Sequence, residues 1–240
     1  MKSVLVLASK YGIEHLRQRI VPHFEADWPQ SLWQWDRLEA EIRAMVATWH
    51  EENWCAGNFK YVDDHLPEPA SAIRLARDCD IPNILPAAFY HLSRLSIHND
   101  RLTARVAQDQ GKADLYGLED LLDGQRTADW NILSSADYIC LLKGRERLST
   151  FTRELFGAVS ISSRQHSQSV DQCCLPQQLA LIRDACDRSP DILETLRRYS
   201  EWGLVREEEV CSMCCAYIRK ELRGFRRAIW NKLPEFFEFI

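Results

Sequence analysis

The sequence is poor in the residues that break helices. Its 240 residues include only nine glycines and nine prolines, with few runs of alternating β-branched residues. Hydrophobic residues make up 46% of the chain and charged residues 27%, an ordinary globular composition that argues against disorder. These features predict an all-α fold, in a chain long enough for one large domain or two modest ones.

Several signals of location and chemistry are also missing. No stretch approaches the roughly 18 consecutive apolar residues that a membrane helix needs, and there is no glycosylation sequon. The nine cysteines are an odd number, so we expect reduced thiols in the cytoplasm or the nucleus. The chain has no Gly-rich phosphate loop, no H-E-x-x-H motif and no G-x-S-x-G motif. We therefore predict no catalytic residues, no bound cofactor and no membrane partner.

What the sequence does contain is one helical-hairpin pattern that occurs twice, 68 positions apart. The first copy covers residues 4–24 and the second covers residues 72–92. Gly12 and Asp80 fall at the same point of the two copies, and both residue types tolerate the left-handed backbone that ends a helix. Each copy is therefore expected to form a short helix, a tight stop and a second helix, as is typical of interaction scaffolds.

The chain is expected to divide into a helical array over residues 1–159 and a smaller C-terminal helical subdomain over residues 173–240. The stretch 160–172 between them is the least apolar part of the chain and is predicted to be a linker. Within the array, a long helix is expected to begin at a cap formed by Ser134 or Ser135.

Four cysteines of the C-terminal part are candidate zinc ligands: Cys173, Cys174, Cys211 and Cys214. Two pairs of thiolates can hold a structural zinc ion in tetrahedral geometry, although adjacent cysteines seldom both reach one metal. Cys211 and Cys214 also continue the three-and-four spacing of an apolar helix face that ends at Ile229. We favour buried thiols, with structural zinc and a thiol enzyme that uses Cys211 or Cys214 as the alternatives.

The last helix, expected from about Val210 to Leu233, carries a run of basic side chains. Arg219, Arg223 and Arg226 are predicted to share one face, opposite the apolar one. Such a face could bind an acidic partner or follow a phosphate backbone, but the net charge of −5 makes nucleic acid the less expected partner. Exposed tryptophans would be further anchors for a partner, and the candidates are Trp28, Trp33, Trp35 and Trp54.

The first hairpin copy resembles the closing helices of a BTB/POZ domain over residues 7–16, which read Leu-Ala-Ser-Lys-Tyr-Gly-Ile-Glu-His-Leu. The rest is similar to the helical, BACK-like region that follows the BTB domain in a large group of fungal, basidiomycete-type proteins. The resemblance implies a BACK-like helical array of hairpins, in which residues 1–27 correspond to the end of a BTB domain. The supporting stretches are residues 84–93, 140–146 and 228–237, together with the cysteines before and at the start of the last helix.

The same resemblance implies a role in protein–protein interaction, as the non-catalytic, post-BTB part of an adaptor or regulatory protein. The strand-rich part of a BTB domain, which forms its dimer and partner surface, has no counterpart in residues 1–240. Cullin-type ubiquitin-ligase docking is therefore not expected, and the apolar face of the first hairpin should be exposed or buried on neighbouring helices. The alternative function is a zinc-stabilised module that binds nucleic acid through the basic last helix.

Overall fold

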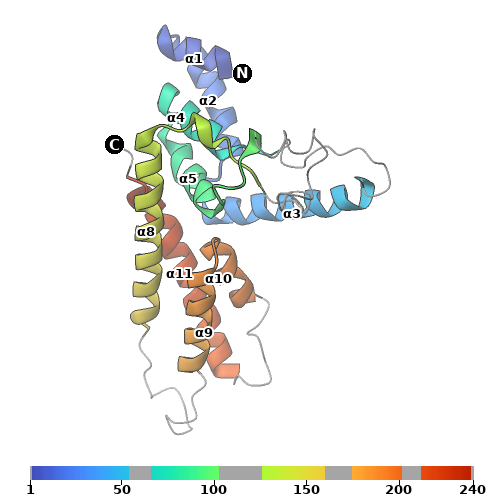
Figure 1. Ribbon diagram of the computed structural model, residues 1–240, viewed down its shortest axis with the longest axis vertical. Coiled ribbons are helices and arrows are strands. Elements are labelled where there is room, and N and C mark those ends of the chain that lie inside the picture. Colours follow the sequence, from blue (N-terminus) through green and yellow to red (C-terminus); the bar gives the residue numbers. More distant parts are fainter. Residues whose placement is uncertain (1, 54–65, 103–125, 160–174, 202–211, 239–240) are drawn as a thin grey trace. The chain divides into compact units, whose positions relative to one another are not determined.

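The computed structural model describes residues 2–53, 66–102, 126–159, 175–201 and 212–238 (Figure 1). Within these ranges the regular secondary structure is helical, apart from one isolated bridge between Asp100 and Ala128. The prediction of an all-α fold is confirmed. None of the described helices is both long enough and apolar enough to cross a membrane.

The chain divides into two compact units, of which the first comprises residues 1–141 with 239–240 and the second residues 142–238. The first unit contains both hairpin copies, and α3 lies between them in the sequence. Its elements are α1 (Lys2–Lys10), α2 (Glu14–Asp27), α3 (Leu32–Asn53), α4 (Pro69–Cys79), the 3-10 turn η2 (Pro82–Ile84), α5 (Leu85–Arg94) and the 3-10 turn η4 (Trp130–Ile132).

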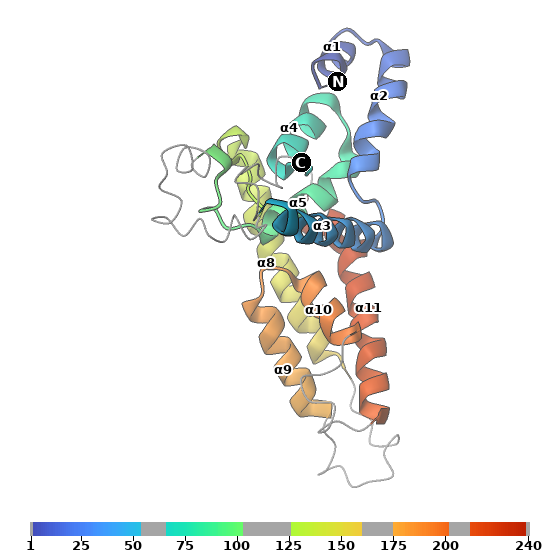
Figure 2. The ribbon, with the colours of Figure 1, turned by 90° about the vertical axis from the view of Figure 1, so that its right-hand side faces the viewer.

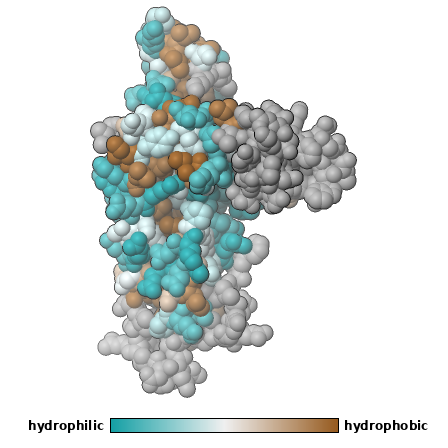
Figure 3. Space-filling view, viewed as in Figure 1, coloured by the Kyte–Doolittle hydropathy of each residue, from teal (hydrophilic) through white to brown (hydrophobic). Residues whose placement is uncertain are grey.

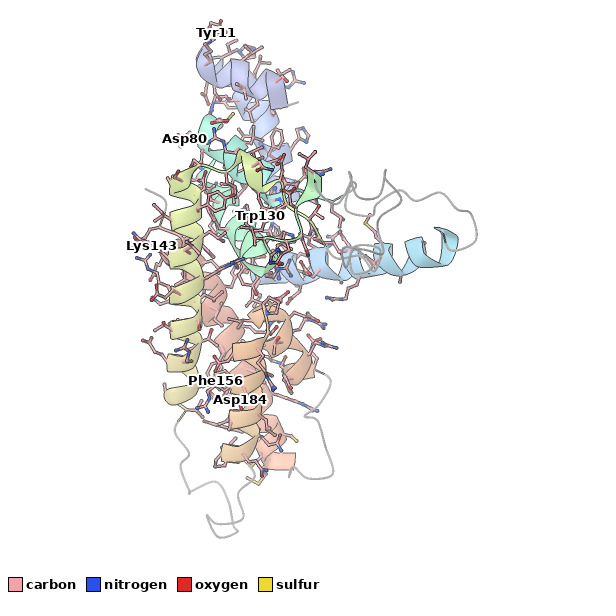
Figure 4. All side chains as sticks on the ribbon, in the orientation of Figure 1. Tyr11, Asp80, Trp130, Lys143, Phe156 and Asp184 are labelled. Carbon is pink, nitrogen blue, oxygen red and sulfur yellow. The ribbon has the colours of Figure 1, made fainter. Side chains whose placement is uncertain are left out.

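Both hairpin copies end their first helix at the predicted left-handed residue. Gly12 has a φ of 64° and Asp80 a φ of 51°; Figure 4 labels Asp80 at the end of α4. In each copy the amide that follows the turn donates to the carbonyl five residues earlier, the bond of a Schellman motif. These bonds are Ile13 N to Ala8 O at 2.8 Å and Ile81 N to Ala76 O at 2.9 Å.

The first hairpin packs on the second through α1, which contacts both α2 and α4. Leu5 of α1 is fully buried, whereas Leu7 and Tyr11 are 52% and 67% exposed. The equivalent residues of the second copy, Leu75 and Cys79, are 4% and 1% exposed. The apolar side of the first hairpin is thus partly buried on neighbouring helices and partly exposed, and Figure 3 shows hydrophobic residues at its surface.

The Arg17 side chain of α2 forms hydrogen bonds to residues of both hairpin copies. The guanidinium of Arg17 donates to the Ser9 hydroxyl at 2.6 Å and to the Cys79 carbonyl at 2.6 Å, and more weakly to the Asp80 carbonyl at 3.4 Å. These carbonyls lie at the C-terminal end of α4, where backbone acceptors have no partner within the helix. Arg17, in the first copy, therefore supplies hydrogen-bond donors to the C-terminal carbonyls of α4, a helix of the second copy.

The second unit is built around α11, which packs mainly against α10, while α9 contacts α10 and, to a smaller extent, α11 (Figure 2). The apolar spacing predicted for this helix is confirmed from Cys214 onward, because Cys214, Ile218 and Leu222 are at most 1% exposed. The helices of this unit are the second part of α8 (Ser135–Gly157), α9 (Leu175–Arg188), α10 (Ile192–Glu201) and α11 (Ser212–Phe236).

The unit boundary lies inside α8, between Leu141 and Leu142. The predicted end of the first domain is at residue 159 instead; the predicted linker 160–172 lies outside the described residues, so the predicted division stays a prediction. The second part of α8 packs into the second unit through aromatic rings. The pairs are Phe151 with Phe236, whose ring centroids are 5.4 Å apart, and Phe156 with Phe225, at 5.1 Å.

The start of α8 is capped as the sequence predicted. The Ser134 hydroxyl accepts from the Asp137 amide at 3.2 Å, and the Asp137 carboxylate accepts from the Ser134 amide at 3.0 Å. This reciprocal arrangement is a capping box. Asp137 is buried and also lies 3.4 Å from Nε of Arg77 on α4, so the cap is fixed to the second hairpin.

Candidate functional site

The solvent side of α11 carries a row of cations. Because Ile218, Leu222 and Ile229 face the core, residues half a turn away from them face solvent. Lys220, Arg223 and Arg227 occupy these positions and all three are exposed. They are spaced by three and four residues, so their side chains neighbour one another on one side of the helix. We call these three residues the cationic face.

The cationic face differs from the predicted one. Arg226 is only 6% exposed, and its Nε donates to the Leu193 carbonyl of α10 at 3.0 Å; the prediction that it shares an exposed face is wrong. Position 226 lies on the side of α11 that α10 covers, and Arg219 is half-buried. Only Arg223 of the three predicted arginines belongs to the face. The apolar spacing from Ile218 could have predicted the exposed cations, because it indicates which side of α11 faces the core.

Among the described residues, no carboxylate forms an ion pair with the cationic face. Two acidic groups of α10, Glu194 and Glu201, both pair with Arg197 of their own helix. The hydrogen bond from Arg197 to Glu194, 2.7 Å long, raises the pKa of Arg197 above its ordinary value. At neutral pH the face therefore presents three positive charges, over two helical turns, that no carboxylate of the described residues pairs with.

The same side of α11 becomes apolar toward its N-terminus. Met213, seven residues before Lys220, is 55% exposed, and Ala216 between them is exposed as well. The surface thus combines an apolar end with a cationic row. This arrangement suits an amphipathic partner with acidic groups better than it suits a uniform polyanion.

The candidate zinc ligands are mostly outside the described residues, namely Cys173, Cys174 and Cys211. Cys214 is 1% exposed on the core side of α11, which argues against its use as a nucleophile. Burial and the neighbouring Asp187 raise the pKa of the buried Cys186 thiol to about 12. The parts of the chain that the structure describes contain no cluster of three potential metal ligands, and structural zinc remains a prediction.

The candidate aromatic anchors separate into buried and exposed residues. Trp28 and Trp35 are 4% and 2% exposed, whereas Trp33 is 67% exposed; Trp54 lies outside the described residues. Trp35 packs against Tyr90 of α5 with ring centroids 5.2 Å apart. Trp33 is therefore the anchor that the described residues offer.

A buried polar cluster in the first unit was not anticipated from the sequence. His91 of α5 is 1% exposed, and its Nδ1 lies 2.5 Å from a guanidinium nitrogen of Arg94. The same nitrogen lies 2.7 Å from the Glu39 carboxylate of α3, and the guanidinium stacks 4.6 Å from the Trp35 ring. Burial, together with the charges of Arg126 and Arg94, lowers the pKa of His91 well below 6.5. The cluster links α3 to α5 and buries the His91 ring, which indicates a structural role.

Comparison with known proteins assigns the chain to no family. No family model matches it, and neither does any curated protein or solved structure. The function is therefore argued from the residues of the chain.

Proposed function

We propose that the chain is a non-catalytic helical module that binds an acidic segment of another protein through the cationic face of α11. The observation that carries this proposal is the row of Lys220, Arg223 and Arg227, exposed and without an ion pair to any described carboxylate. A protein surface that keeps three neighbouring cations uncompensated is suited to a partner that supplies the opposite charge.

The length of the row favours a protein partner. Lys220 and Arg227 are seven residues apart, which corresponds to about 10 Å along a helix. Carboxylates spaced by three and four residues on a partner helix repeat over the same length. Nucleic-acid binding generally requires a larger positive surface in a basic domain, whereas this chain has a net charge of −5.

The resemblance to BTB/POZ proteins supports the same kind of function. Residues 7–16 and the stretches 84–93, 140–146 and 228–237 resemble the end of a BTB domain and the BACK-like region after it. On this basis we place the chain in the post-BTB part of an adaptor or regulatory protein. The hairpin form of the two copies agrees with that placement without requiring it.

Binding to a designed acidic helix tests the proposal. The probe is a fluorescein-labelled helical peptide with glutamates at positions i, i+3 and i+7 beside an apolar row, titrated with the full chain and followed by anisotropy. Reversal of all three charges (K220E, R223E and R227E) should weaken binding about tenfold or more, because each exposed pair contributes roughly 0.2–1 kcal/mol and becomes repulsive. The matched control reverses Lys143 and Arg198, two exposed cations on α8 and α10, and should leave binding unchanged.

A second probe distinguishes the proposed function from the alternative, a zinc-stabilised module that binds nucleic acid. A short DNA duplex should bind weakly and without preference; tight binding that falls steeply with salt would favour the nucleic-acid module instead. Metal analysis of the purified protein tests the zinc part of this alternative. One zinc ion per chain, together with a loss of helical content in chelator, would establish the zinc-stabilised form. Equal peptide affinity for wild-type and charge-reversed chains would refute the acidic-partner proposal.

A further inference from the structure

The outer side of α3 carries four exposed residues spaced by four. Trp33 is 67% exposed and Met45 is 41% exposed. The side chains of Arg37 and Glu41 between them are 66% and 56% exposed. We call these four residues the α3 ridge. The core side of α3 carries Trp35 instead, which is 2% exposed.

The α3 ridge is ordered by interactions within itself. Nε of Arg37 lies 2.8 Å from the Glu41 carboxylate, and the Arg37 guanidinium lies 6.0 Å from the centre of the Trp33 ring. In the described part of the chain, the ion pair and the cation–π contact of the ridge connect only ridge residues. The ridge therefore presents a preorganised row of side chains to solvent, which lowers the entropy cost of binding.

The order of residues along the ridge is self-complementary. It is aromatic, basic, acidic and apolar, so a second copy that runs in the opposite direction presents the matching order. Residues spaced by four form a row inclined to the helix axis, and the rows of two helices run side by side when the helices cross at about 50°. With that crossing and a two-fold axis beside position 39, Trp33 meets Met45 of the second copy and Arg37 meets Glu41 of the second copy. Thioether–aromatic contacts and charge-assisted hydrogen bonds are favourable pairings. A parallel arrangement would instead oppose arginine to arginine and glutamate to glutamate.

We propose that the α3 ridge binds the α3 ridge of a second copy of this chain, antiparallel and with two-fold symmetry. Each contact then occurs twice, as in any isologous interface. This inference goes beyond the proposed function, because it involves neither α11 nor an acidic partner. One helix packed on its copy buries less than the roughly 800 Å² per partner of a standard interface, so we expect a weak dimer that depends on concentration.

Charge reversal at the two central positions gives a specific test. Sedimentation equilibrium of the full chain, from micromolar to millimolar concentration, should show a monomer–dimer equilibrium. R37E and E41R should each raise the dimer dissociation constant about tenfold or more, because both symmetric pairs become repulsive. An equimolar mixture of R37E and E41R should regain the dimer as a heterodimer, and the double variant R37E/E41R should regain it as a homodimer.

A matched control separates this effect from the loss of a helix ion pair. Arg74 and Asp78 of α4 form an exposed pair with the same spacing, 3.2 Å apart, so R74E should leave the dimer unchanged. Helical content by circular dichroism confirms that each variant is folded. A chain that stays monomeric up to millimolar concentration would overturn the proposal. So would a dimer that survives R37E and E41R, or a mixture that fails to regain it.

Discussion

His91 shows how one buried side chain joins helices that are distant in the sequence. Its Nδ1 accepts a hydrogen bond from Arg94, which also pairs with Glu39 of α3. With Nδ1 as the acceptor, the proton of the neutral ring resides on Nε2. A second proton would place a cation in a buried site beside the positive charge of Arg94, so the folded state holds His91 neutral.

The pH dependence of stability follows from this arrangement. The folded-state pKa of His91 lies well below the unfolded value of 6.5. The buried, neutral side chain therefore makes its full contribution to the free energy of unfolding above pH 6.5. Below that pH the unfolded chain takes up a proton that the folded chain excludes, and stability falls by about 1.4 kcal/mol per pH unit until the folded pKa is reached. Urea unfolding of wild-type and His91→Gln chains between pH 5 and 8 checks this. The wild type should lose more stability than the variant, and parallel curves would contradict the prediction.

At the scale of elements, Gly144 of α8 accommodates the ring of Phe237, the residue that follows α11. A Cβ atom placed on Gly144 would lie 2.0 Å from a ring carbon of Phe237, well inside any allowed contact. Phe237 is fully buried, so its ring has little room to move. The absence of a side chain at Gly144 therefore leaves the space that the ring of Phe237 occupies.

Alanine at this position should be costly. Gly144→Ala is expected to lower the free energy of unfolding of the second unit by about 1–3 kcal/mol, because the core must shift to admit the methyl group. Gly224→Ala in α11 is the matched control, since nothing lies within 4 Å of its Cβ position. That control should stabilise the helix by up to about 1 kcal/mol. Thermal unfolding of the two variants should shift in opposite directions; a loss in both would point to a general intolerance of alanine.

The sequence predicted the features that depend on local chemistry. The turns at Gly12 and Asp80 and the cap at Ser134 were predicted because residue type and position determine them. The burial of Arg226 was missed, because it depends on which side of α11 another helix covers. The contacts of Phe151 with Phe236 and of Phe156 with Phe225 were not predicted for a similar reason, because their partners lie more than 60 residues later in the chain.

At the scale of the whole molecule, we expect the two units to contribute separately to stability, because the contacts of the residues below lie within one unit each. Arg17 acts only within the first unit, where it bridges the hairpin copies through the Cys79 carbonyl. Gly144 acts only within the second. Substitutions at the two positions are therefore expected to loosen different parts of the chain.

Amide hydrogen exchange can show this separation. Arg17→Ala should lower the stability of the first unit by about 1–2 kcal/mol, since hydrogen bonds to a charged donor are lost. Faster exchange should appear in α1, α2 and α4, with α9, α10 and α11 unchanged. Arg19→Ala, an exposed residue on the same helix, should leave exchange as in the wild type. Faster exchange throughout the chain in the Arg17 variant would show that the units unfold together.

The left-handed turns at Gly12 and Asp80 also affect the order in which parts of the first unit fold. Their hydrogen bonds span five residues, so each turn closes a very short loop and can form early at little entropic cost. The Arg17 contact with Cys79 spans 62 residues and needs both hairpins in place first. Folding of the first unit should then begin at two places independently, and substitutions at the turns should slow folding while loss of Arg17 should mainly speed unfolding.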